Sequence, residues 1–352
     1  MAKIIDIADN GVEVKFLEKL RRIIQSAHLD FLIGAGCSYP ALSVLGNIEK
    51  DIQTALKSED FNQAEKIKFD FLVKHFELTQ SLRDPWISDE GLETIKNYES
   101  LLDNIANILF ERKSNILYKQ ANIFSTNYDL LIEAAAGNRD DSIILNDGFR
   151  RTSQLNKLYQ YSTSEFFNVI KSTGSIYNYQ FEIPIINLLK LHGSMNWEII
   201  HDSVFQSFDH LDKADKVKTG TTIKDMEIFN NSFSLVLPQK DKFRQTVLDN
   251  TYYNLLRLYA NELDKENVVL IVDGFSFADE HILEITKRGL KNPTMQLILF
   301  CYDKSAKDDA VIKFSKFNNV DIVYRATEQF SFSAFNDLLA KVIFIKPGDK
   351  NE

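Results

Sequence analysis

The chain has 352 residues, long enough for one large domain or two smaller ones, and its 44% hydrophobic and 26% charged residues are ordinary for a globular protein. Its 41 Lys and Arg against 50 Asp and Glu give a net charge of −9, which argues against extensive binding to a nucleic-acid backbone. Two cysteines cannot build a disulfide framework, and without a signal peptide or a membrane-length apolar run we expect a cytoplasmic protein.

The first predicted elements are a helix and a strand. Apolar residues at helical spacing predict a helix over 16–27, and the apolar run 29–33 directly after it indicates a buried strand. Similar runs follow at residues 121–124, 186–191, 233–237, 268–272, 296–301 and 321–324. Several of these runs are continuous rather than alternating, which is typical of central strands in a parallel sheet covered on both faces.

Predicted helices lie between these runs, at about 92–109, 249–263 and 279–290. Strands that alternate with helices predict an α/β fold built from βαβ units. Residues 43–118 are almost wholly helical in pattern and too long for a simple crossover, so we expect a helical insertion there. The polar stretch 201–230 is expected to be an exposed loop.

The first strand ends in Gly34-Ala35-Gly36-Cys37-Ser38. Glycines let a backbone approach a pyrophosphate closely, and exposed amide N–H groups together with Ser38 can bind its oxygens. The segment is neither a GxGxxG fingerprint nor a P-loop, because no Gly-Lys-Ser/Thr follows. A tight strand-to-helix turn without any ligand explains the same residues equally well.

Polar residues also follow the strand 121–124. Asn127 offers an amide that can orient a water or a ribose hydroxyl, and Asp129 can accept hydrogen bonds from hydroxyls. The alternative is an Asn/Asp N-cap for a helix that starts near Leu130, which by itself is the better explanation.

A histidine ends the strand 186–191. His192 is followed by Gly193 and is the best candidate for a general base, because the unperturbed pKa of histidine lies near working pH. A buried, hydrogen-bonded structural histidine is the commoner alternative.

Gly274 and Ser276 follow the strand 268–272, and Asp279 beyond them suits a helix N-cap. In a doubly wound sheet the carboxyl ends of such strands converge on one crevice. The four strand ends therefore predict one shared site.

In identity, order and strand context these motifs resemble the SIR2 (sirtuin) superfamily, and more closely the SIR2-like NAD hydrolases of bacterial anti-phage defence. The resemblance covers about residues 29–303. It is carried by Gly34–Ser38, Thr126–Asp129, Leu191–Ser194 and Gly274–Ser276, with support from Asp147–Phe149, Asn196-Trp197, Leu237-Pro238 and Lys242.

The resemblance implies a single SIR2-like domain over 1–352, with a Rossmann-like, doubly wound, mostly parallel sheet. Its NAD-binding part would comprise 29–42 plus 119–345, and 43–118 would be the helical insertion. NAD is the implied substrate. Asn127 and His192 would be catalytic, and the NAD-binding residues would be Gly34, Ala35, Gly36, Ser38, Asp129, Gly274 and Ser276.

Three departures separate the chain from the protein-deacylase sirtuins. It lacks the four zinc cysteines, the Phe-Arg segment after Ser38 and a Phe-Gly-Glu type element after His192. We therefore expect no zinc, and NAD hydrolysis to nicotinamide and ADP-ribose is favoured. The alternatives are an NAD-dependent protein deacylase or ADP-ribosyltransferase, and a non-catalytic module that senses NAD or ADP-ribose.

The resemblance also implies control by assembly, because an uncontrolled NAD hydrolase would be toxic. We expect a homo-oligomer with a HerA-type ATPase or another operon-encoded activator as partner. Direct contact with nucleic acid or with a membrane is not expected. The stretch 43–118 is the expected surface for assembly or for gating the site.

Overall fold

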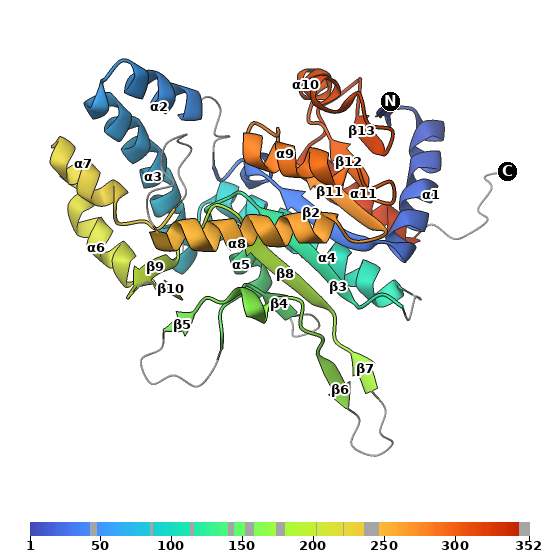
Figure 1. Ribbon diagram of the computed structural model, residues 1–352, viewed down its shortest axis with the longest axis horizontal. Helices are drawn as coiled ribbons and strands as arrows, with labels where there is room; N and C mark the ends of the chain where they lie inside the picture. The colour runs from blue at the N-terminus through green and yellow to red at the C-terminus, as the bar shows by residue number, and fades with distance from the viewer. Residues whose placement is uncertain are drawn as a thin grey trace.

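The computed structural model describes residues 1–42, 48–84, 87–112, 116–139, 144–151, 158–173, 180–201, 203–220, 222–235 and 246–344. Its centre is an eight-stranded sheet in the order β1-β13-β12-β11-β2-β3-β8-β4, in which every neighbouring pair is parallel (Figure 1). The strands are β1 (Lys3–Asp6), β2 (His28–Ile33), β3 (Gln120–Ser125), β4 (Ile144–Asn146), β8 (Ile185–Lys190), β11 (Val268–Asp273), β12 (Gln296–Phe300) and β13 (Val320–Tyr324).

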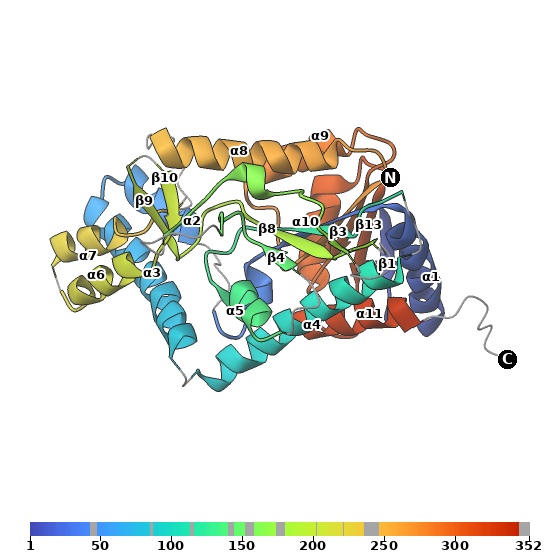
Figure 2. The ribbon, with the colours of Figure 1, turned by 90° about the horizontal axis from the view of Figure 1, so that it is seen from below.

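The continuous apolar runs form the central strands, as predicted, because helices cover both faces of the sheet. One core, on the face of α1 (Asn10–Ser26), α4 (Asp89–Glu111), α5 (Leu131–Gly137) and α11 (Phe332–Phe344), takes Phe31 from β2. The other core, on the face of α8 (Thr246–Leu263), α9 (Glu280–Gly289) and α10 (Lys304–Phe314), takes Leu32 (Figure 2). The fold is α/β and Rossmann-like, in three layers.

One strand prediction was wrong, and two strands of the main sheet were not predicted. In the run 233–237 the described residues 233–235 form no strand, and only an isolated bridge joins Leu235 to Gly193. Strands β1 and β4 were not predicted, because β1 is a partly exposed edge strand and β4 has only three residues. Short edge strands carry too few buried positions to give a continuous apolar run.

The predicted helices are present, and their caps set where they begin. Helix α1 starts before the predicted residue 16, because the side chain of Asp9 accepts the N–H groups of Gly11 and Val12. Helix α4 likewise starts after Ser88, whose side chain accepts from Gly91 N–H. The apolar stripe of each helix begins only where the helix meets the sheet.

A group of helices lies to one side of the sheet (Figures 1 and 2). It consists of α2 (Ile48–Lys57), α3 (Phe61–Arg83), α6 (Asp209–Lys218) and α7 (Ile223–Asn230). Residues 201–230 are therefore not an exposed loop, as the polar composition had suggested. Helices α6 and α7 bury only a few apolar side chains, and a Thr222–Asp225 capping box starts α7.

The stretch 43–118 thus divides between two places in the fold. Helices α2 and α3 belong to the side group, whereas α4 packs directly on the sheet through the core of α1 and α11. Tyr128 and Met195, from loops at the sheet's carboxyl edge, pack in the apolar cluster of the side group. The side group therefore supports those loops.

The remaining strands lie outside the main sheet. Strands β5 (Tyr159–Gln160), β9 (Trp197–Ile200) and β10 (Ser203–Gln206) form a small antiparallel sheet. Strands β6 (Lys171–Thr173) and β7 (Gln180–Glu182) form a ribbon that projects from the body of the molecule (Figure 1). Over the described part of the chain, no helix combines the length and the apolarity needed to cross a membrane.

Candidate functional site

The strand order places the predicted site residues at one edge of the sheet. From β2 the chain proceeds to β3 and β8 on one side and then returns to β11 on the other side, so the order reverses between β2 and β11. In open α/β sheets ligands bind outside the carboxyl ends of the strands at such a reversal. Ser125 pairs with Lys190 at the end of β3 and β8, and Asn127 and His192 each lie two residues beyond that pair.

Three glycines let the loops after β2 and β11 approach closely. A Cβ on Gly34 would lie 2.3 Å from the carbonyl oxygen of Gly274, and a Cβ on Gly36 would lie 2.8 Å from the Cα of Gly274. Gly274 itself has a φ of +65°. The N–H groups of Gly34 and Gly36 donate across this junction to the carbonyl oxygens of Asp273 and Gly274. These glycines therefore let the two loops pack together at the switch point, which is the place between β2 and β11 where the strand order reverses.

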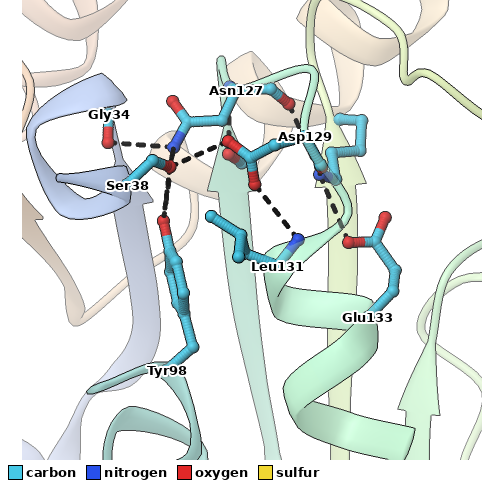
Figure 3. Close-up of polar contacts among 9 residues, drawn as sticks. Gly34, Ser38, Tyr98, Asn127, Asp129, Leu131 and Glu133 are labelled. Carbon is cyan, nitrogen blue, oxygen red and sulfur yellow. Dashed lines mark hydrogen bonds and ion pairs between the residues drawn. The ribbon is translucent and has the colours of Figure 1, made fainter. Parts of the chain in front are cut away.

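The hydroxyl of Ser38 points into the protein (Figure 3). Its Oγ donates to Oδ2 of Asp129 at 2.8 Å and lies 3.1 Å from the hydroxyl of Tyr98. It also accepts from Nδ2 of Asn127 at 3.0 Å. Ser38 is 1% exposed, so its hydroxyl belongs to a buried network.

The side-chain NH₂ group of Asn127 is hydrogen-bonded, whereas its side-chain oxygen accepts no hydrogen bond from the described residues. Nδ2 lies 3.0 Å from the carbonyl oxygen of Gly34, 3.0 Å from Ser38 Oγ and 3.3 Å from Tyr98 OH. The side chain is 4% exposed, yet no described residue donates a hydrogen bond to Oδ1. Buried acceptors are nearly always paired in native proteins, so this oxygen is available to a hydrogen-bond donor from a ligand or water.

Asp129 uses both of its carboxylate oxygens inside the protein. Its Oδ1 accepts from Leu131 N–H at 3.1 Å at the start of α5, while Oδ2 accepts from Ser38. One oxygen thus accepts an N–H group at the start of α5, where Leu130 is the N-cap residue, and the other accepts a hydroxyl of the protein.

Lys190 was not predicted as a site residue. It anchors the loop between β3 and α5. Its buried ammonium donates to the carbonyl oxygens of Asn127 at 3.4 Å and Asp129 at 2.5 Å. It also lies 3.4 Å from Oε2 of Glu133, whose pKa burial raises although Lys190 opposes that shift. A lysine that ends an otherwise apolar strand was the available signal.

His192 is paired with a carboxylate. Its Nε2 lies 3.0 Å from Oδ2 of Asp279. Burial raises the pKa of Asp279, but the hydrogen bond and charge of His192 outweigh burial and bring that pKa below its usual range. Because Nε2–H donates to Asp279, the other ring nitrogen, Nδ1, is the one that can accept a proton.

Aromatic rings flank this histidine. The ring centroid of His192 lies 6.2 Å from that of Tyr128 and 5.9 Å from that of Tyr252 on α8. The imidazole is thus held between the loop after β3 and a helix on one face of the sheet.

A comparison with known protein families gives the family of the chain. The profile of the SIR2-like domain matches residues 121–323, more than half of the chain. The protein is a member of the SIR2-like domain family. A search among curated proteins found no match. SIR2-like domains use NAD, which indicates an NAD-related activity for this chain.

The SIR2-like match includes Asn127, His192 and Gly274, whereas Gly34–Ser38 and Tyr98 lie before it. The structure joins the two parts, since Asn127 contacts Gly34, Ser38 and Tyr98 directly. The tertiary fold thus extends the SIR2-like site beyond the matched residues.

A second buried pair in the SIR2-like protein lies behind the glycine junction. Cys37 Sγ donates to Oδ2 of Asp273 at 3.2 Å, and both side chains are buried. Burial raises the pKa of Asp273 to about 7, although hydrogen bonds from Cys37 and Gly274 oppose the shift. Burial also raises the pKa of the Cys37 thiol, so Cys37 is not a thiolate nucleophile.

Other predicted residues lie at the margin of the SIR2-like site. Ser276 is exposed, and its carbonyl oxygen accepts from Nζ of Lys313 at 2.6 Å. Ala35 is half-buried between the junction glycines. Leu237-Pro238 and Lys242 lie outside the described residues. Within the described ranges, no group of three or more His, Cys, Asp or Glu side chains is placed to hold a metal ion.

Proposed function

We propose that this SIR2-like protein is an NAD⁺ hydrolase that cleaves the nicotinamide–ribose bond to give nicotinamide and ADP-ribose. The observation that supports it best is the buried amide of Asn127, with Nδ2 bound inward and Oδ1 open. His192 follows the adjacent strand and offers Nδ1 as a base. Together they supply one group to orient a nucleophile and one to deprotonate it.

The chemistry of this bond matches what the site offers. Glycosidic cleavage passes through a transition state with oxocarbenium character. The nicotinamide of NAD⁺ is cationic and departs neutral, so the leaving group needs no general acid. A second catalytic carboxylate is therefore unnecessary, and orientation plus a single base suffices.

Each residue then has a defined part. Oδ1 of Asn127 accepts a hydrogen bond from the attacking water or from a ribose hydroxyl. Nδ1 of His192 takes a proton from one of these groups. Asp279 holds the imidazole through Nε2 and stabilises the positive charge that the imidazole gains.

The loops after β2 and β11 would bind the diphosphate and adenosine parts of NAD⁺. We infer that the backbone of the turn Gly34–Cys37 holds the diphosphate and that Gly274 and Ser276 line the adenosine end. The buried hydroxyl of Ser38 instead serves the network around Asn127. The position of both loops at the carboxyl edge, between β2 and β11, supports this arrangement.

We further propose that the activity serves anti-phage defence by depleting NAD. Because such an enzyme must be controlled, we propose a homo-oligomer switched on by a HerA-type ATPase or a similar activator. The resemblance of the strand-end motifs to defence proteins supports this role. Light scattering of the protein alone and with the products of neighbouring genes measures the assembly, and a monomer in both cases would contradict it.

The experiment that tests the hydrolase is incubation of the purified protein with NAD⁺, alone and with those gene products, followed by product identification by mass spectrometry. Asn127→Ala and His192→Asn should each lower nicotinamide release by roughly 10²–10⁴-fold. Asn254→Ala, on α8, where the side chain donates to Asn250, and His201→Asn, in the β9–β10 turn, are matched controls with unchanged rates.

The products also separate the alternatives. Release of nicotinamide that depends on an acyl-lysine peptide or a protein acceptor indicates a deacylase or an ADP-ribosyltransferase. NAD that binds but stays intact after long incubation with the activator indicates a sensing module. Either result overturns the hydrolase.

A further inference from the structure

The buried hydroxyl of Tyr98 is a part of the site that the proposed chemistry does not use. Tyr98 comes from α4, and its side chain is fully buried. Its OH lies 3.1 Å from Ser38 Oγ and 3.3 Å from Nδ2 of Asn127 (Figure 3). A tyrosine hydroxyl buried against a proposed catalytic amide can act on that amide's orientation.

The donors and acceptors in this network fix the direction in which the two hydroxyl groups donate. Asp129 as a carboxylate can only accept, so the hydrogen of Ser38 goes to Oδ2 of Asp129. Ser38 Oγ then accepts, and the hydrogen of Tyr98 goes to it. The two hydrogens of Asn127 Nδ2 are shared among three acceptors: the carbonyl oxygen of Gly34, Ser38 Oγ and the oxygen of Tyr98. The hydrogen bonds therefore run in one direction, from the amide through two hydroxyls to the carboxylate.

We propose that Tyr98 is a positioning residue, which together with Ser38 and Asp129 locks the amide of Asn127 with Oδ1 facing the substrate. This inference rests on the proposed function, because NAD⁺ hydrolysis is the reaction in which Oδ1 of Asn127 would accept a hydrogen bond. The locked Oδ1 selects a ligand group that donates a hydrogen bond, such as a water or a ribose hydroxyl.

The opposite orientation of the amide is excluded by the same partners. With the amide turned over, Oδ1 would face the carbonyl oxygen of Gly34, which has no hydrogen to donate. The hydrogen of Ser38 would also have to leave Asp129. Figure 3 shows the oxygen of Asn127 on the side of the amide away from Tyr98 and Ser38.

The surroundings keep this chain of hydrogen bonds intact. Burial, and then the charge of Asp129, raise the pKa of Tyr98, so its hydroxyl keeps the hydrogen that it donates. The ring of Tyr98 packs edge-on against Phe332 of α11, with centroids 5.0 Å apart. A chain of hydrogen bonds that ends on a charge polarises its members, which makes Oδ1 of Asn127 a stronger acceptor.

The test is Tyr98→Phe, which removes the hydroxyl and keeps the ring. The rate constant kcat for nicotinamide release should fall roughly tenfold, as expected for the loss of one orienting hydrogen bond, with KM for NAD⁺ within about twofold of the parent. Ser38→Ala should behave alike. The double variant should lose less than the product of the two single losses, because both act through one amide.

Tyr259→Phe is the matched control. Tyr259 is also fully buried, and its hydroxyl has one side-chain partner, Oγ1 of Thr286 at 2.7 Å, away from the site. It should lose a comparable hydrogen bond without a change in kcat. Equal losses of kcat in both variants, or a changed KM with unchanged kcat in Tyr98→Phe, would overturn the proposal.

A second readout does not depend on hydrolysis. The side-chain NH₂ signal of Asn127 is assigned in an ¹⁵N spectrum by its loss in Asn127→Asp. Its hydrogens should exchange slowly with solvent in the parent and in Tyr259→Phe, and faster in Tyr98→Phe. If the parent does not hydrolyse NAD⁺ but this difference appears, the proposed function fails while the lock stands; equal exchange in all three proteins refutes the lock.

Discussion

Oδ2 of Asp279 lies 3.0 Å from Nε2 of His192, while Oδ1 of the same carboxylate accepts the N–H groups of His281 and Ile282 at the start of α9. One side chain therefore caps a helix and orients the proposed base. Because the pKa of Asp279 is lowered, the carboxylate stays charged at neutral pH. Its stabilising contribution is present above about pH 4 and is lost as the pH falls through the lowered pKa.

Asp279→Asn should separate these two roles. Asparagine caps helices about as well as aspartate, so the helix cap is kept and the folded protein loses only the contribution of the charge at neutral pH. Without the charge the imidazole loses its orienting partner, and nicotinamide release should fall by roughly 10²-fold. Steady-state kinetics and a thermal melt measure the two effects. Asp303→Asn, at the N-cap of α10, is the control, and equal activities of the two variants would contradict the assignment.

Lys190→Met should destabilise the protein, because it leaves the carboxyl of Glu133 without its cation and frees two carbonyl groups of the loop between β3 and α5. Removing one partner of a buried ion pair costs roughly 3–5 kcal/mol. Since Glu133 is partly exposed, we expect a loss of about 3 kcal/mol in urea denaturation. The double variant with Lys190→Met and Glu133→Gln should recover part of this loss in unfolding free energy.

The control for Lys190 is Lys287→Met on α9. Lys287 pairs with Glu284 at 3.0 Å on the protein surface, where an ion pair contributes roughly 0.5 kcal/mol. A loss for Lys190→Met no larger than for this exposed pair would show that Lys190 does not hold the loop.

Asp273→Asn should change how stability depends on pH. The pKa of Asp273 is raised from 3.8 to about 7, so between these values the folded protein holds a proton that the unfolded chain releases. The free energy of unfolding should therefore fall as the pH rises through this window, and level off above it. Relative to the variant, the parent should lose a few kcal/mol between pH 4 and pH 7.

Urea denaturation of both proteins at several pH values measures this difference. Asp30, whose pKa is about 8 because of burial and the nearby Glu262, contributes in the same direction in both proteins and cancels in the comparison. Parallel pH profiles for parent and variant would show that the carboxyl of Asp273 titrates normally.

Gly274→Ala should destabilise the junction of the β2 and β11 loops. A Cβ there would lie 2.6 Å from the backbone nitrogen of Cys37, at a φ of +65° that alanine adopts at a cost. We expect a loss of about 2 kcal/mol or more in unfolding free energy, with reduced NAD⁺ binding. Gly137→Ala is the control. A Cβ at Gly137 would meet no neighbouring group within 4 Å, so the free energy of unfolding should stay unchanged or rise slightly.

Much of the sheet could be predicted from the sequence, because its central strands are buried on both faces and so appear as unbroken apolar runs. The run 268–272, for example, became the fully buried β11. Helices α6 and α7 were missed because they face solvent and bury only residues such as Leu211 and Phe229. A polar helix and a polar loop have the same composition, and only tertiary contacts separate them.

The sequence also placed the proposed catalytic pair, since Asn127 and His192 follow apolar strands and the pattern of a doubly wound sheet brings such strand ends together. It did not reveal Tyr98 or Lys190. Tyr98 fits an ordinary apolar stripe on α4, and its hydroxyl has meaning only beside Ser38 and Asn127. For Asp279 the sequence indicated the cap and not the contact with His192.

By itself, then, the sequence determined the α/β class, the strand ends that carry polar residues and the SIR2-like character of the chain, because these depend on local pattern and order. The tertiary structure decided which side chains meet: Ser38 with Asp129, Tyr98 with Asn127, and His192 with Asp279. The reason is physical. Hydrogen bonds need atoms within about 3 Å of each other, and for residues far apart in sequence the packing of helices on the sheet sets that distance.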